Sequence, residues 1–184
     1  MSIGMNIATS LAATLAAGAV GLAIAAAAPN GPGGPPAEGD ARQLWDWLDE
    51  AGYRQWAPWP GAGKAATVGF YQGRAPHGAR LKLFVNRRAL SNPDDPPAGS
   101  VLVKENYGPD GGELVAITIM QKIDGFDPDN GDWFYAKYGA EGAIARQAGQ
   151  LVAGKVQSCI ECHETAAGDD YIFANDEDHG RGGG

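Results

Sequence analysis

The chain has few cysteines, histidines and methionines, and few basic side chains. Its 184 residues include two cysteines, three histidines and three methionines, and no methionine follows residue 120. Lysine and arginine total 14 against 22 aspartates and glutamates, which leaves a net charge of −8. Nucleic acids and anionic membrane surfaces are bound by basic patches. The charge balance therefore argues against both as partners.

The first 37 residues have no charged side chain at all. An alanine-rich apolar run covers residues 7–28 and ends in small residues, as a secretory signal peptide does before its cleavage site. The same run is long enough to span a bilayer as an uncleaved anchor. We expect residues 1–28 to be a signal peptide, with an N-terminal anchor as the alternative. Either one predicts that the remaining chain is periplasmic or otherwise exported.

The rest of the chain divides into three parts by composition. Residues 29–39 (PNGPGGPPAEG) have the composition of a Pro/Gly linker. Residues 40–176 contain the periodic apolar patterns of one folded domain. Residues 177–184 are polar and rich in glycine, which predicts a flexible tail.

Within the domain, strand patterns outnumber helical ones. Apolar residues at helical spacing predict a helix over 40–52. Strand patterns fall at residues 80–86, 100–107, 114–122 and 132–138, with a shorter one at 67–71. Residues 114–122 are apolar on both faces, which indicates a central strand. We predict an α+β, mainly β fold, in which a twisted antiparallel sheet with a few short helices precedes a C-terminal motif.

That motif contains both cysteines, in the sequence Cys159-Ile160-Glu161-Cys162-His163. C-x-x-C-H is the attachment signature of c-type haem. Two thiols on one side of a helical turn can add to the two vinyl groups of the porphyrin, and the histidine that follows can bind the iron as proximal ligand. The sequence therefore predicts one covalent haem c per chain, anchored by the two cysteines and ligated by His163.

Other interpretations of the motif are less consistent with the chain. A zinc site would need a second pair of ligands, and no cysteine remains to supply it. A thioredoxin-type C-x-x-C needs no following histidine and expects a βαβ setting. A disulfide between such near neighbours would close a small, strained loop. The ordinary small cytochromes c also differ, because they are mostly helical and have an axial methionine downstream of the motif.

Four segments together resemble the cytochrome P-460 family, which includes the cytochromes c′-β. They are residues 75–79 (APHGA), 99–107 (GSVLVKENY), 132–138 (DWFYAKY) and 159–173, and the likeness extends over about residues 43–176. The resemblance implies a β-rich homodimer with a c-type haem. It also implies a small nitrogen compound as ligand, since the family's enzymes oxidise hydroxylamine and the c′-β members bind nitric oxide at a five-coordinate iron. The redox partner stays unidentified, and an oxidoreductase and a non-catalytic nitric-oxide binder both remain open.

The resemblance gives Lys104 a specific role. In the hydroxylamine-oxidising members, a lysine in a matching V-K-E context is linked covalently to a meso carbon of the haem, and Lys104 falls on that position. The alternative is a lysine at a strand edge that faces solvent. Strand alternation places Lys104 on the same face as Leu102, and it would turn Glu105, a conceivable base, away from that face.

Two further residues are candidates for the distal side of the haem. His77 is either a structural hydrogen-bonding residue or a distal acid/base group. Met120 is most simply a core residue. If either one filled the sixth coordination position, the protein would instead be a plain electron-transfer cytochrome.

Overall fold

The computed structural model describes residue 1 and residues 33–59, 70–166, 168 and 170–175. The predicted signal peptide or anchor (apart from residue 1), the first part of the linker and all of the predicted tail lie outside these residues. Most of the strand predicted at 67–71 does so as well. Among the described residues, no helix combines the length and the apolar character that crossing a membrane requires.

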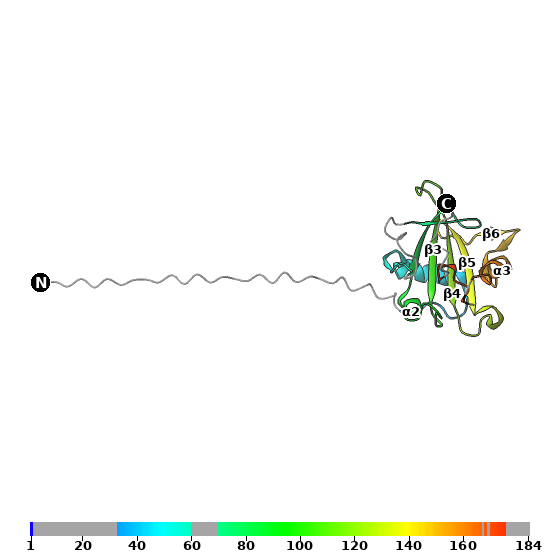
Figure 1. The fold of residues 1–184 in the computed structure, drawn as a ribbon, viewed down its shortest axis with the longest axis horizontal. Helices are drawn as coiled ribbons and strands as arrows, with labels where there is room; N and C mark the ends of the chain where they lie inside the picture. The colour runs from blue at the N-terminus through cyan, green and yellow to red at the C-terminus, as the bar shows by residue number, and fades with distance from the viewer. Residues whose placement is uncertain (2–32, 60–69, 167, 169, 176–184) are drawn as a thin grey trace.

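A six-stranded antiparallel sheet forms the body of the domain (Figure 1). Its strand order is β1-β2-β3-β4-β5-β8. The strands are β1 (Tyr71–Gln72), β2 (Arg80–Val85), β3 (Val101–Tyr107), β4 (Leu114–Lys122), β5 (Trp133–Gly139) and β8 (Ala153–Gly154). The four longer predicted strands are confirmed, and β4 lies between β3 and β5 as its apolar sequence predicted.

The remaining elements are short. The helices are α1 (Ala41–Glu50), α2 (Arg87–Leu90) and α3 (Gln157–His163), with 3-10 turns at Tyr53–Gln55, Pro128–Asn130 and Phe173–Asn175. A small hairpin of β6 (Arg146–Gln147) and β7 (Gln150–Leu151) had no clear signal in the sequence. These elements confirm the predicted α+β, mainly β fold class.

The sheet separates two apolar cores. On one face, helix α1 packs against a cluster of side chains from β3, β4 and β5, namely Val101, Val103, Ile117, Ile119, Phe134, Ala136 and Tyr138. On the other face, α3 packs against a second cluster, which includes Leu102, Met120, Trp133, Tyr135 and Ile172. Because side chains alternate along each strand, neighbouring residues of β3 belong to different cores.

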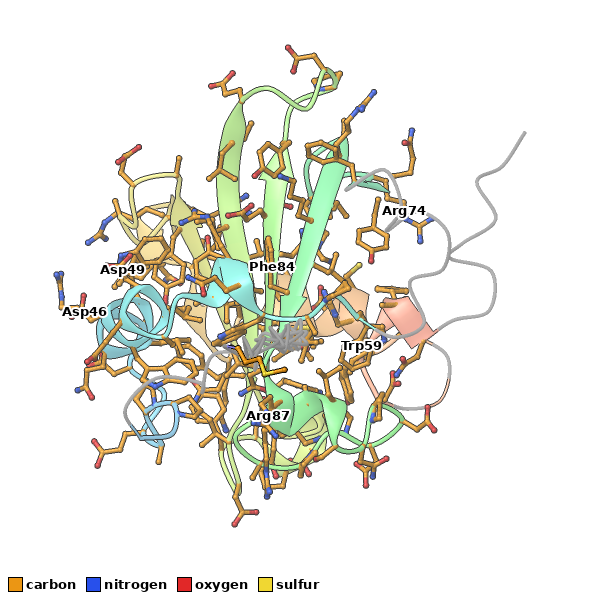
Figure 2. All side chains as sticks on the ribbon, turned by 90° about the vertical axis from the view of Figure 1, so that its left-hand side faces the viewer. Asp46, Asp49, Trp59, Arg74, Phe84 and Arg87 are labelled. Atoms are coloured by element: carbon orange, nitrogen blue, oxygen red, sulfur yellow. The ribbon has the colours of Figure 1, made fainter. Side chains whose placement is uncertain are left out.

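Helix α1 is fixed at its first turn. The Asp40 carboxylate caps it by accepting hydrogen bonds from the backbone N–H groups of Arg42 (2.8 Å) and Gln43 (2.9 Å). The Tyr138 hydroxyl donates to the carbonyl of Ala41 (2.6 Å), which joins the start of the helix to β5. Asp46 lies on the solvent side of the helix (Figure 2), so the acidic face of α1 points away from the sheet.

Glu105 is the charged group most deeply placed in the α1 core. Its side chain is almost completely buried, and its carboxylate accepts hydrogen bonds from the hydroxyls of Tyr53 (2.8 Å) and Tyr107 (2.6 Å). The guanidinium of Arg54 adds an ion pair at 2.7 Å. Burial, together with this carboxylate, raises the pKa of Tyr107 to about 12. Glu105 is therefore a structural acceptor, and it lies on the sheet face opposite Lys104.

We expect Glu105→Gln to lower the free energy of unfolding by about 2 kcal/mol, because an amide cannot accept all three hydrogen bonds and leaves the Arg54 charge unpaired. Denaturant titration of the purified domain measures the change. Glu113→Gln is the matched control, since Glu113 is an exposed glutamate in the turn just before β4. Equal unfolding midpoints for the two variants would show that the buried cluster contributes nothing to stability.

Candidate functional site

Helix α3 carries the two cysteines, which are both free thiols. Cys159 is half-buried and Cys162 is exposed, and both line the same cavity as His163. Burial raises the pKa of the Cys159 thiol. The short helix confirms the predicted local structure, and it brings both sulfurs to one wall of a single cavity.

The ring of His163 is held in one orientation by the chain itself. Its Nδ1 lies 2.7 Å from the carbonyl oxygen of Tyr171, an acceptor, so Nδ1 carries the proton and Nε2 keeps its lone pair. Tyr171 adopts a left-handed backbone conformation (φ 64°) at this point. Burial lowers the pKa of His163 to about 4, so the ring is neutral at neutral pH. A neutral imidazole with its other nitrogen tied to a carbonyl is the usual arrangement of a metal ligand.

The cavity lies between the sheet and α3. Its walls are largely apolar, with contributions from Leu83, Leu102, Met120, Val152 and Ile172. The Tyr135 hydroxyl is buried there without a hydrogen-bond partner among the described residues. Two thiols, an imidazole with a free Nε2 and an apolar chamber together fit a covalently held haem.

Lys104 lies on the wall of this cavity, on the face predicted from strand alternation. It comes from β3, which is paired on both sides with β2 and β4, so Lys104 is not at an edge of the sheet. Burial lowers its pKa to about 8, and a Cys162 thiolate would oppose that shift. The amine is therefore easier to deprotonate than an ordinary lysine.

His77 also reaches the cavity, from the turn before β2. Its ring centroid lies 6.2 Å from that of His163, and the two ring planes are perpendicular, at 89°. A hydrogen bond joins the His77 ring to the side chain of Asn106, which also accepts from the N–H of Gly78 (3.1 Å). Its Nδ1 is buried and has no partner within the described part of the chain. Burial, followed by the charge of Lys104, lowers the pKa of His77 to about 3.

Met120 lines the cavity from β4 and packs in the core on that face, as the simplest interpretation of the sequence expected. Sequence reasoning missed two neighbours, Thr118 and Lys137, which also line the cavity. Side chains alternate along β5, so Lys137 lies on the same face of this strand as Trp133 and Tyr135. That alternation was a usable signal, but it becomes meaningful only once the face of β5 that points to the motif is known.

The titratable side chains that line the cavity include basic groups and no carboxylate among the described residues. The lining contains two lysines and two histidines, and none of its described residues is an aspartate or a glutamate. Although the chain has a net charge of −8, the described part of the cavity wall is basic.

Comparison with known proteins identifies one family. The family model described as Cytochrome P460 matches residues 51–174, from the end of α1 to the last turn after the motif. The match includes Lys104, His77 and all of α3. Among curated proteins, none matches the chain significantly.

Proposed function

The chain belongs to the cytochrome P460 family of c-type cytochromes, and on that premise we propose that it is an exported mono-haem protein that oxidises hydroxylamine at an open iron site. The observation that carries the proposal is Lys104, which lies on the wall of the cavity that also contains His163. The charge-free segment at residues 1–37 supports export. A homodimer, which the family resemblance implies, belongs to the same proposal.

Three residues would hold the haem. Cys159 and Cys162 would form the thioether bonds, and His163 would bind the iron through Nε2. When bound, the haem supplies an iron centre that accepts electrons one at a time and passes them on to a redox partner. The side chains around it determine what reaches that centre and where protons go.

His77 would serve as a hydrogen-bond acceptor for the substrate, because its lowered pKa keeps the ring neutral and makes it a weak base. Its neutral ring faces the space next to His163, and its unpartnered Nδ1 can accept a hydrogen bond from an N–H or O–H group there. The hydrogen bond to Asn106 fixes the ring orientation. The cavity that His77 shares with Leu102 and Met120 is largely apolar, which limits the water in it. His77 thus has both a structural contact and a free nitrogen for chemistry.

Lys104 would supply the covalent link to the ring that the family resemblance implies. Forming a C–N bond there removes one hydrogen from the ring carbon and one from the amine, with two electrons, so it requires a two-electron oxidant such as peroxide. A lowered pKa provides the neutral amine that such a bond needs. Without the link, the largely apolar cavity favours the second candidate, a nitric-oxide binder of the c′-β type.

We expect the haem to resist extraction by acid acetone, because thioether bonds survive that treatment. The double variant Cys159→Ala, Cys162→Ala should release any haem that it binds. Ser158→Ala, which changes the neighbouring cavity residue and keeps both thiols, is the control and should retain its haem. Haem that extracts from the wild-type protein would refute covalent attachment.

For Lys104, we expect the wild-type protein to have a red-shifted haem spectrum and Lys104→Ala to have the spectrum of an ordinary c-type haem. Lys82→Ala is the matched control, because Lys82 lies on the neighbouring strand but on the other face of the sheet. Optical spectra of the ferric and ferrous proteins measure the difference. An ordinary spectrum for the wild type would exclude the link and favour the nitric-oxide binder.

Replacement of His77 by phenylalanine keeps a ring in the cavity and removes the proton acceptor. We expect His77→Phe to slow hydroxylamine oxidation about 100-fold, the lower end of what a general base contributes, because the low pKa of His77 makes it a weak base. The ferric iron should be high-spin in both proteins. A low-spin wild type that becomes high-spin in His77→Phe would instead identify His77 as the sixth ligand of an electron-transfer cytochrome.

A further inference from the structure

Lys137 is the second lysine of the cavity, and no role has been assigned to it above. The strand pairing places Lys104 opposite Thr118, and Thr118 opposite Lys137, so the three side chains form a row across the same face of the sheet. Strands lie about 4.8 Å apart, which puts the Cα atoms of the two lysines roughly 10 Å from each other. Two side chains of this length can bring their ammonium groups to a common point.

The position of Lys137 within the cavity follows from its neighbours. Its positive charge acts on the Cys159 thiol, whose pKa it lowers against the effect of burial. The same charge also lowers the pKa of the His77 ring. Lys137, Cys159 and His77 all line the same cavity.

Lys137 has no carboxylate partner in the described part of the chain. The two ion pairs found there are Arg54–Glu105 and Lys155–Asp127, both outside the cavity. Lys137 is half-buried, and an ammonium group at a largely apolar wall is stabilised by a hydrogen-bonded anion; none of the described lining residues supplies a carboxylate. An anion from outside would complete the site.

The carboxylates of the haem are poor candidates for that anion. They would lie away from the thioether bonds of Cys159 and Cys162, whereas Lys137 lines the cavity together with both cysteines. A link between Lys104 and the ring would also make that nitrogen less basic. Lys137 would then be the main positive charge of the protein that faces the cavity.

We propose that Lys137 holds a small monovalent oxyanion in the haem cavity, of the class of nitrite, by a charge-assisted hydrogen bond from its ammonium group. The inference rests on the proposed function and deepens it, since nitrite is the oxyanion reached by further oxidation at the nitrogen of hydroxylamine or nitric oxide. Exclusion of acidic side chains from the cavity favours an anion over a cation of similar size. Lys104 assists where its amine is free.

The proposal is tested by titrating the purified, haem-loaded ferric protein with sodium nitrite. Binding is measured from the shift of the main haem absorption band. Nitric oxide, a neutral ligand of similar size, is titrated in parallel. We expect Lys137→Gln to weaken nitrite binding 10- to 100-fold, as about 1.5–3 kcal/mol for one lost hydrogen bond to a charged group predicts. Lys137→Arg keeps the charge and should stay within about threefold of wild type. Nitric-oxide affinity should be the same in all three proteins.

The outcomes separate this inference from the proposed function. Unchanged nitrite affinity in Lys137→Gln, or an equal loss for nitrite and nitric oxide, overturns the anion site while the open iron stands. A wild-type protein that binds neither ligand overturns both proposals. Haem content per chain, measured as the pyridine haemochrome, verifies loading, and Lys137→Met serves as a second neutral variant if Lys137→Gln does not mature.

Discussion

The alternation of side chains along β3 determines which residues enter the core under α1 and which face the cavity next to α3. This strand is hydrogen-bonded on both sides, so its register cannot slip without breaking two ladders of bonds. Lys104 and Glu105 are adjacent in sequence and point in opposite directions as a result. One faces a chamber next to the cysteine motif, and the other is buried under α1 with three hydrogen-bond donors. A shift of one residue would bury an amine among tyrosines and place a carboxylate in the cavity.

The parts of the site that follow from local sequence could be predicted. The C-x-x-C-H spacing requires only one helical turn, and the side of the sheet occupied by Lys104 requires only period-two alternation. His77 could be identified as a candidate but not placed, because its approach to His163 depends on how a turn near residue 77 returns over the sheet. The carbonyl of Tyr171 could not be predicted at all, since any residue has a carbonyl and only the left-handed backbone there directs it to the ring.

The fold shows the same division between local and long-range information. Strands of six to nine residues could be predicted from their side-chain pattern. By contrast, β6, β7 and β8 have two residues each, and they form only because β8 pairs with β5 and β6 pairs with β7. Lys137 depends on both kinds of information. Its strand was predicted, yet its closeness to Cys159 depends on the chain folding back from β5 through the small hairpin to α3.

The hydrogen bond between His163 and Tyr171 means that the main chain, and no side chain, orients the predicted iron ligand. The acceptor is a backbone carbonyl eight residues further along the chain. Because every residue has a carbonyl, a change of the side chain at position 171 does not remove this acceptor. Only a change in the backbone path there, where Tyr171 adopts a left-handed conformation, can turn the ring or expose its Nδ1.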